Sequence, residues 1–375
     1  MKILDTKTSC GPAQNFPPSS LFAGQTKQVI TILGIESSCD ETSVSVVKGG
    51  QKKIKILSNI VSSQINLHKK YGGVYPELAS RAHLENIIPC IRASLEQAKI
   101  GLDNIDLIAV TSGPGLIGSL LVGVNTAKTL AYALDKPIMG INHLEGHIYA
   151  NFADGIPDQT FPAIALIVSG GHTCLVLMKN QLQYKIIGQT RDDASGEAFD
   201  KVAQILGLTY PGGPAIEAAA YQMQKAKRKT QNLKIKLPRP MIDSADFDFS
   251  FSGLKTAVLY LVKQLKDGRL ENVRREIAYE VQKAVTEVLI EKTIKAARQH
   301  EAKSILLSGG VAANAWLRRE FELAIKKLKI KFFVPPKILC TDNAAMIAIA
   351  AYYKSLKKQP SKWYNIFANA NAKLA

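Results

Sequence analysis

The sequence predicts an α/β protein made of two lobes that are built in the same way. The chain has 375 residues, and at roughly 100–200 residues per domain this length is enough for two domains. Each half opens with two β-rich runs around a short polar turn, and strand and helix patterns then alternate with glycine-rich turns between them. We expect a flexible N-terminal extension (1–28), a first lobe (29–150), a second lobe with a helical insertion (151–355) and a C-terminal tail (356–375).

The first lobe is expected to begin with a β-hairpin. Residues 29–35 form a β-rich run, residues 36–42 a polar turn, and residues 43–47 alternate with the period of two that is typical of a strand. The later patterns predict a helix, a strand, a glycine-rich loop and a helix, at residues 77–99, 105–110, 113–118 and 119–134.

The second lobe is expected to begin in the same way. Residues 163–168 and 173–178 indicate two strands around the turn Ser169-Gly170-Gly171-His172. Helices are predicted at residues 196–206, 214–227, 277–299, 312–327 and 343–353, and strands at 304–307 and 331–334. Residues 247–256 alternate aromatic and polar side chains, which predicts a further strand with one buried face.

Composition and charge limit the partners and the compartment. The net charge of +17 favours a polyanionic partner, although solvated lysine-rich surfaces are a common alternative. Seven basic residues and no acid lie within residues 225–239. Five scattered cysteines without a CxxC pair indicate reduced thiols in a cytoplasmic protein. The sequence contains no apolar run of roughly 18 residues and no signal pattern, so we expect no membrane span.

Two histidines are spaced as metal ligands on one helix. His143 and His147 are four residues apart and share a helix face, so both imidazoles can bind one ion. Without a further ligand, two polar surface histidines are the alternative. Glu145 is two residues after His143, about 200° round a helix of 3.6 residues per turn. In the His-Glu-x-x-His peptidases the glutamate directly follows the first histidine, so this spacing argues against that class.

Asp342 is the candidate third ligand. It lies in Thr341-Asp342-Asn343, directly before an apolar helix, where a carboxylate could instead serve as the N-cap. Two histidines and one carboxylate would leave coordination positions open, as is typical of a site that carries out chemistry.

Glycine turns and two acids suggest a nucleotide between the lobes. Residues 169–171 and 308–310 each follow an apolar strand, and glycine lets backbone N–H groups approach an anion closely. A single turn of this kind is more commonly a plain tight turn, but two in one α/β chain favour a nucleotide. Asp40 and Glu41, unless they are only a solvated turn, would face the same cleft. Carboxylates beside phosphates repel unless a cation lies between them.

Together these segments resemble one family, the tRNA threonylcarbamoyltransferases in their bacterial form, over about residues 30–355. The motifs that carry the resemblance are GIESSCDET (34–42), YGGVYPELASR (71–81), GPGL (113–116), HLEGH (143–147), VSGGH (168–172), GEAFDK (196–201), DFSFSGLK (248–255), GGVAAN (309–314) and TDN (341–343). So many motifs in the same order make a chance match very improbable.

The resemblance implies a fold, a reaction and partners. The implied fold is actin-like, as in hsp70 and sugar kinases, with a nucleotide and metal cleft between two related lobes. The implied reaction transfers a threonylcarbamoyl group from threonylcarbamoyl-AMP to N6 of the adenosine 3′ of the anticodon, in tRNAs that read ANN codons, and releases AMP. Besides tRNA, the implied partners are a paralogous subunit without the metal site and a small ATPase.

The resemblance also implies roles for individual residues. His143, His147 and Asp342 would hold one divalent metal ion per subunit, Fe²⁺ or alternatively Zn²⁺. The donor nucleotide would be bound by Ile167, Val168, Ser169, Gly170, Gly171, Asp200, Gly213, Glu217 and Asn314. Asp40 and Glu41 would be the catalytic acids, with Asp40 as the candidate general base.

Three other interpretations stay open. A small-molecule kinase or ATPase of the same fold class would explain the hairpins and glycine turns but would leave both histidines without a role. A metallopeptidase, an older label for this family, is disfavoured by the position of Glu145. A non-catalytic scaffold within a modification complex would leave the metal and nucleotide motifs unused.

Overall fold

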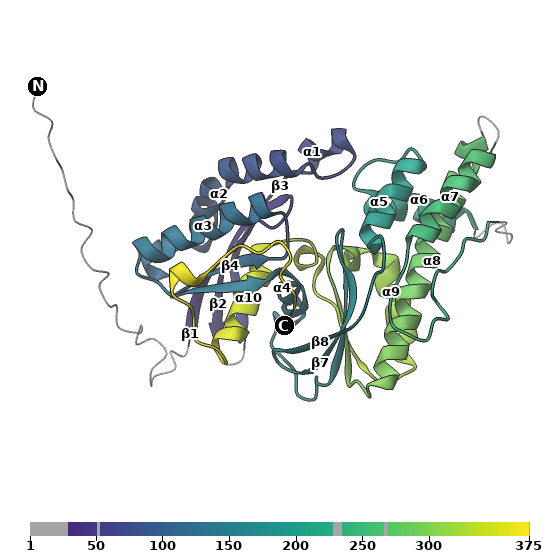
Figure 1. Ribbon diagram of the computed structural model, residues 1–375. Coiled ribbons are helices and arrows are strands. Elements are labelled where there is room, and N and C mark those ends of the chain that lie inside the picture. Colours follow the sequence, from purple (N-terminus) through teal and green to yellow (C-terminus); the bar gives the residue numbers. More distant parts are fainter. Residues whose placement is uncertain (1–28, 51–52, 228–234, 266–268, 375) are drawn as a thin grey trace, which may run out of the picture.

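The molecule contains two five-stranded β-sheets with helices beside them (Figure 1). This computed structural model describes residues 29–50, 53–227, 235–265 and 269–374. The predicted flexible extension, residues 1–28, lies outside the described residues, and so do residues 228–234 of the predicted basic stretch. Among the described helices, none has the combination of length and apolar character that crossing a membrane requires.

The first sheet has the strand order β3-β2-β1-β4-β5. Its strands are β1 (Val29–Glu36), β2 (Glu41–Gly50), β3 (Ile54–Ser63), β4 (Leu107–Gly113) and β5 (Ile138–Asn142). β1 and β2 form the predicted hairpin, in which Glu36 lies opposite Ser43. β3 adds a second antiparallel neighbour to β2, whereas β4 and β5 run parallel to β1.

The second sheet repeats this plan in the order β10-β9-β6-β7-β8. Its strands are β6 (Ala163–Val168), β7 (Thr173–Asn180), β8 (Gln183–Gln189), β9 (Ser304–Ser308) and β10 (Lys331–Phe333). An antiparallel meander is again extended by two parallel strands on the side of its first strand. Each strand of the first sheet therefore has a counterpart in the second, which confirms the predicted pair of related lobes.

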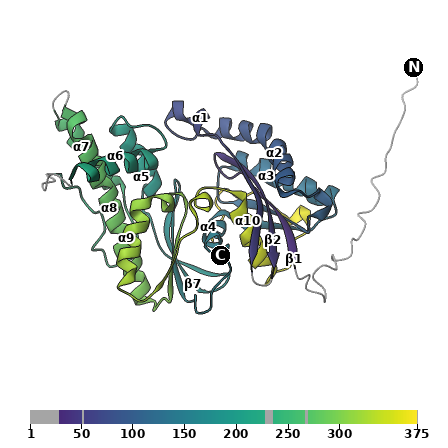
Figure 2. The ribbon, with the colours of Figure 1, turned by 180° about the vertical axis from the view of Figure 1, so that it is seen from behind.

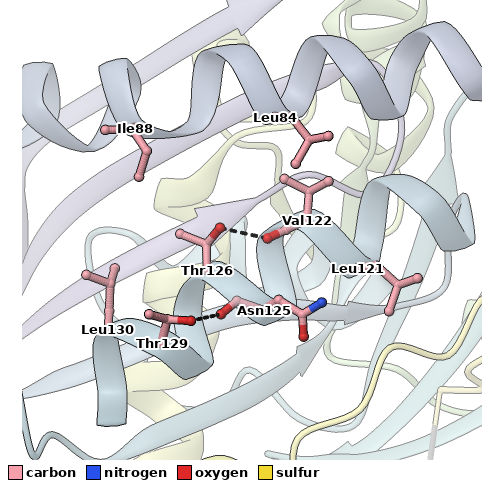
Figure 3. A pocket seen from close by; sticks show the side chains of 8 residues that line it. All are labelled: Leu84, Ile88, Leu121, Val122, Asn125, Thr126, Thr129 and Leu130. Atoms are coloured by element: carbon pink, nitrogen blue, oxygen red, sulfur yellow. Dashed lines mark hydrogen bonds between the residues drawn. The ribbon is translucent and has the colours of Figure 1, made fainter. Parts of the chain in front are cut away.

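Two long helices, α2 (Pro76–Ala98) and α3 (Ile117–Ala133), cover one face of the first sheet. α1 (Ile65–His68) and the 3-10 turn η2 (Lys69–Tyr71) lead into α2. An apolar groove of about 480 Å³ runs between α2 and α3 (Figure 3). Leu84, Ile88 and Leu121 line it and are 65%, 48% and 45% exposed. Its lining includes no residue predicted for the functional site.

The second lobe carries the longest helix of the fold. Its helices are α5 (Ser195–Ile205), α6 (Gly212–Lys227), α7 (Ser252–Gln264), α8 (Arg269–Gln299) and α9 (Ala315–Lys326). α8 packs against α6 and α9 and against the second sheet, where residues such as Val281 and Leu289 are buried.

The strand predicted at residues 247–256 is wrong, although its alternation is real. Phe247, Phe249 and Phe251 are buried in the second core. The backbone of Phe249 makes a single bridge to the end of β8, and α7 then begins at Ser252. The Asp192 carboxylate accepts hydrogen bonds from the backbone N–H groups of Phe251 and Ser252, which favours the start of a helix over a continued strand.

Two helices, α4 (His143–Tyr149) and α10 (Ala344–Ser355), lie between the sheets (Figures 1 and 2). They share one apolar core with residues of both sheets, such as Ile32 and Ala165. α10 falls within the range predicted for the second lobe, but it packs against β1 and β2. The exact lobe boundaries stay a prediction. Because α4 and α10 meet in this shared core, the ends of both helices are held in a fixed relation.

Candidate metal and nucleotide site

Helix α4 carries the two histidines directly after β5. The helix starts there because the side chain of Asn142 caps it, its Oδ1 accepting a hydrogen bond of 2.9 Å from the N–H of Leu144. His143 and His147 lie on one face, with ring centroids 4.6 Å apart and an interplanar angle of 80°. The predicted shared face is therefore confirmed.

Asp342 lies across from these histidines, in the turn before α10. The cap of α10 is its neighbour Asn343, whose Oδ1 accepts a hydrogen bond of 3.0 Å from the N–H of Met346. Asp342 is therefore not the N-cap. Its Oδ1 lies 3.5 Å from Nε2 of His143 and 3.2 Å from Nε2 of His147. One donor atom from each of the three residues lies within 4.8 Å of the others.

The chemistry of this cluster fits a metal ion. His147 is fully buried, its Nδ1 lacks a hydrogen-bond partner among the described residues, and its Nε2 has the Asp342 carboxylate beside it at 3.2 Å, so Nε2 and the carboxylate are placed to bind one ion. Burial lowers the pKa of His147, which keeps the ring neutral as a ligand must be. Burial also acts to lower the pKa of His143, but the charges of Asp342 and Glu36 outweigh it and raise that pKa to about 9. The two carboxylates thus favour positive charge at this point.

Glu36, which the sequence did not single out, orients His143. It ends β1 and is fully buried. Its Oε2 lies 3.0 Å from Nδ1 of His143 and accepts a hydrogen bond of 2.7 Å from Oγ1 of Thr111. Its Oε1 accepts one of 2.5 Å from the N–H of Ser38. Burial pushes the pKa of Glu36 up, but the charge and hydrogen bond of His143 lower it overall. Nε2 of His143 is thereby left facing Asp342.

Replacing Glu36 with glutamine is expected to lower metal affinity by roughly 10–100-fold, because partners of this kind fix the orientation and basicity of a ligand histidine. Competition with a chromophoric chelator measures this affinity. Glu145→Gln is the matched control, since Glu145 is a buried acid on the same helix as His143. Its carboxylate binds Tyr184 and Lys354 and not a histidine. Equal losses in both variants, or no loss in Glu36→Gln, would contradict this role.

The glycine turn after β6 lies beside the histidine cluster. The N–H of Ser169 donates to the carbonyl of His172 at 2.8 Å, which closes the turn. A Cβ on Gly170 or Gly171 would meet open space, so their backbone is accessible to a ligand. The pKa of His172 is lowered to about 4 by burial and then by the charges of His143 and His147, which places the turn within electrostatic reach of them.

Two other residues predicted for this turn contribute differently. Ile167 and Val168 belong to β6, and their side chains are fully buried in the sheet. They can therefore reach a ligand only through their backbone.

The second glycine turn, residues 308–310, needs a glycine at position 309. Gly309 has φ +91°, and a Cβ there would lie 2.3 Å from the carbonyl oxygen of Val168. The second turn thus packs against the end of β6, directly before the first turn.

The remaining nucleotide candidates fall into two neighbouring pairs. Asp200 accepts a hydrogen bond of 2.6 Å from the N–H of Gly212, beside Gly213, whose Cα faces open space. Glu217 accepts one of 2.8 Å from the N–H of Ala315, and Asn314 caps the same helix, α9. The first pair lies between α5 and α6, and the second between α6 and α9.

The two hairpin acids face the same space. Asp40 and Glu41 are half-buried at the bend between β1 and β2. Burial, followed by the charges of Asp40 and Asp342, raises the pKa of Glu41 well above its usual value. Burial raises the pKa of Asp200 to about 6, and the charge of Asp40 contributes to this rise. Glu41 therefore lies within electrostatic reach of Asp342, and Asp40 within reach of Asp200.

This arrangement defines a class: an actin-like protein of two lobes with a candidate metal site and a glycine turn between them. Full-length HypF in a phosphate- and nucleotide-bound form shares the fold, with a TM-score of 0.55 and 12% identity over 89% of this chain and 47% of that chain. HypF from T. kodakarensis gives a TM-score of 0.53, 14% identity and coverages of 88% and 48%. At these identities the likeness shows the fold alone, and it spans about half of each HypF chain.

Sequence comparison identifies the family. A family model for tRNA N6-adenosine threonylcarbamoyltransferase matches residues 55–349. Relatives with that name are 52% identical in Symbiobacterium thermophilum, over 86% of this chain and 91% of the relative, and 50% identical in Thermosipho africanus, over 92% and 99%. The chain belongs to the tRNA N6-adenosine threonylcarbamoyltransferase family, which confirms the resemblance.

Proposed function

We propose that this protein transfers a threonylcarbamoyl group from threonylcarbamoyl-AMP to N6 of the adenosine 3′ of the anticodon, in tRNAs that read ANN codons. The observation that carries the proposal is the convergence of three features on one space: the cluster of His143, His147 and Asp342, the glycine turn beside it, and Asp40 on the hairpin bend. These three features suit a donor that holds both a phosphate and an acyl group, together with an amine acceptor.

The cluster is proposed to hold one divalent ion, Fe²⁺ or alternatively Zn²⁺. Two histidines and one carboxylate with open positions are the ligand set of non-haem Fe²⁺ sites, and closely related sets hold catalytic Zn²⁺. Such an ion would supply Lewis acidity toward oxygen atoms of the donor. Asp342 suits this role because the charge of His143 and the hydrogen bond of His147 outweigh its burial and lower its pKa, so it is ionised throughout the neutral range.

The donor nucleotide is proposed to lie along the second lobe. Backbone N–H groups of residues 167–171 would bind its phosphate, where Gly170 and Gly171 leave the approach open. Asp200 and the backbone of Gly213 would hold the ribose. Glu217 and Asn314 would contribute to the base or acyl part, although both already take part in hydrogen bonds around α9.

The chemistry asks the protein mainly to position two substrates and to accept one proton. The N6–C bond forms, the bond between the carbamoyl carbon and the phosphate oxygen breaks, and AMP leaves with that electron pair. Because adenine N6 is weakly nucleophilic, a base that accepts its proton during attack is expected to help. Asp40 is the proposed base, because it lies on the hairpin bend within electrostatic reach of Asp200 at the proposed donor site.

The acceptor and other partners are proposed from the family. tRNA is the acceptor, and a paralogous subunit without the metal site and a small ATPase are the proposed protein partners, in the cytoplasm. In the predicted basic stretch, Lys225 is exposed, whereas Arg239 pairs with Glu280 and with Glu287 at 2.7 Å and so is not part of a free basic surface. Residues 228–234 of the stretch lie outside the described residues.

The decisive experiment is a transfer assay on unmodified tRNA transcript with synthetic threonylcarbamoyl-AMP, with and without the paralogue and the ATPase of the same organism. We expect threonylcarbamoyladenosine in the digested tRNA, detected by mass spectrometry, and one equivalent of AMP. Metal analysis of protein purified without added metal tests Fe²⁺ against Zn²⁺. ATP hydrolysis without tRNA, and no transfer under any condition, would favour the kinase interpretation instead.

The peptidase interpretation loses support from the position of Glu145. Its Oε1 accepts a hydrogen bond of 2.9 Å from the hydroxyl of Tyr184, and its Oε2 pairs with Nζ of Lys354 at 3.0 Å. The carboxylate therefore binds these two side chains and not the two histidines. It does not occupy the place of a zincin general base.

A further inference from the structure

A second pocket, of about 360 Å³, lies between the lobes beside the proposed donor site. From the first lobe it is lined by Lys69, Lys70 and Tyr71 of η2. From the second lobe it is lined by residues that include Asp200 and Tyr210. The pocket therefore begins at the proposed ribose position and opens toward a segment to which nothing so far assigns a role.

The rim of this pocket carries two exposed aromatic rings. Tyr71 and Tyr75 are 51% and 49% exposed, and their ring centroids lie 5.6 Å apart. The segment between them is anchored from below, because the N–H of Tyr75 donates to Nδ1 of the buried His68 at 3.2 Å. His68 is in turn held by Gln64 at 3.0 Å. The two rings are thus exposed to solvent, while hydrogen bonds through His68 hold the backbone that carries them.

Positive charge lies next to these rings. Lys69 and Lys70 are both exposed, and within the described ranges neither forms an ion pair with a carboxylate. Nζ of Lys70 lies 5.0 Å from the centroid of the Tyr71 ring. A lysine charge and a half-exposed aromatic ring therefore lie at one place, the combination with which proteins bind single-stranded nucleic acids.

The floor of the pocket has the opposite character. Asp200 lines it, and the charges of Asp40 and Asp200, after burial, raise the pKa of Tyr210. An acidic floor repels phosphates but can accept hydrogen bonds from the amino groups of bases. A nucleotide that enters would place its base inward, toward Asp40, and its phosphate outward, toward the lysines.

We propose that this pocket and its rim receive the unpaired loop of the RNA substrate. Bases next to the target adenosine stack on Tyr71 and Tyr75, Lys69 and Lys70 bind the loop phosphates, and the target base passes between the lobes toward Asp40. The inference rests on the proposed function, and it names the surface that turns a donor site into an RNA-specific one. Unpaired loops are the part of RNA whose bases are free to stack in this way.

Removing the rings is expected to weaken RNA binding without changing its electrostatics. In Tyr71→Ala/Tyr75→Ala, affinity for fluorescently labelled unmodified tRNA should fall by at least roughly 5- to 150-fold, the range for the loss of a single stacked base. KM for tRNA should rise in parallel, while the slope of log affinity against log salt concentration stays unchanged. Tyr71→Trp, which keeps an aromatic ring, should bind as wild type, and Tyr260→Ala, which removes a ring that is 59% exposed on α7, is the control.

Removing the charges should have the complementary signature. In Lys69→Gln/Lys70→Gln the salt slope should become shallower by about 0.7 for each phosphate that a lysine no longer neutralises, the value for single strands. Lys357→Gln/Lys358→Gln is the matched control. This pair of exposed lysines lies just before Ser361, which bonds to Ile138 at the start of β5, the opposite end of that strand from His143.

The outcomes separate this inference from the proposed function. AMP affinity, measured by calorimetry, should be the same in wild type and all variants. If the tyrosine variant and the lysine variant both kept the tRNA affinity and salt slope of an active wild type, the proposed RNA contact at this pocket would be wrong. The proposed transfer function would remain intact. If these variants lost affinity for the paralogous subunit but kept affinity for tRNA, the proposed RNA contact would also be wrong, and the rim would be a protein contact. A wild type that binds tRNA through these residues but never modifies it would overturn the proposed function and not the surface.

Discussion

Replacing His147 with alanine is expected to abolish metal binding and to lower transfer by at least roughly 100-fold. His147 is fully buried, and its Nε2 lies 3.2 Å from Oδ1 of Asp342. A bound ion contributes several kcal/mol of charge stabilisation in the transition state, and each 1.36 kcal/mol is about tenfold in rate. Metal content by mass spectrometry and transfer rate are the two measurements.

Thermal unfolding distinguishes a missing ligand from a damaged fold. A metal at 100 times its dissociation constant stabilises the folded state by about 2.7 kcal/mol, so wild-type Tm should rise when metal is added. The Tm of His147→Ala should not respond. His300→Ala, at a half-buried histidine that follows the end of α8, should behave as wild type. Full metal content and normal turnover in His147→Ala would show that the cluster is not a metal site.

Much of the fold follows from the sequence because its strands and helices have strong local patterns. The hairpins at residues 29–47 and 163–178 were predictable, since buried β-rich runs flank a short polar turn in each. The order of strands was not, because it depends on contacts between distant segments. The same limit applies to α10: an apolar helix does not reveal from its own residues that it packs against β1 and β2.

The failure at residues 247–256 has a similar physical origin. The aromatic alternation correctly predicted that Phe247, Phe249 and Phe251 are buried. It could not reveal that Asp192, a residue distant in sequence, would accept hydrogen bonds from the backbone at this point and start a helix. Tertiary capping therefore decided the local structure.

The ligand residues of the site were easier to predict than the residue that supports them. The spacing of His143 and His147 pointed to these two residues, and the family motifs added Asp342. The sequence around Asp342, taken alone, left it with two possible roles. Only the structure shows that Asn343 caps α10 and leaves Asp342 free. Glu36 gave a weak signal, a single acid at the end of a strand of buried residues. Its contact with His143 joins residues that are far apart in the sequence.

Replacing Asp40 with asparagine is expected to lower kcat by roughly 10²–10⁴-fold, the usual effect of losing a general base. Asparagine keeps the size of the side chain but does not accept the proton that N6 of the adenosine must lose. Metal content and AMP affinity should stay at wild-type values, because Asp40 is not among the groups proposed to bind the metal ion or AMP. Single-turnover rates with saturating tRNA and donor measure the chemical step directly.

The pH–rate profile and a control substitution at another acid show whether Asp40 accepts a proton or only shapes the bend. Loss of a base should remove the acidic limb of the pH–rate profile, because that limb reports the ionisation of the essential base. Asp103→Asn, at an exposed acid before β4, should leave both rate and profile unchanged. If Asp40→Asn kept the acidic limb, or lost its metal together with its activity, Asp40 would be a residue that shapes the bend. The proton would then have to pass to Glu41 or to water.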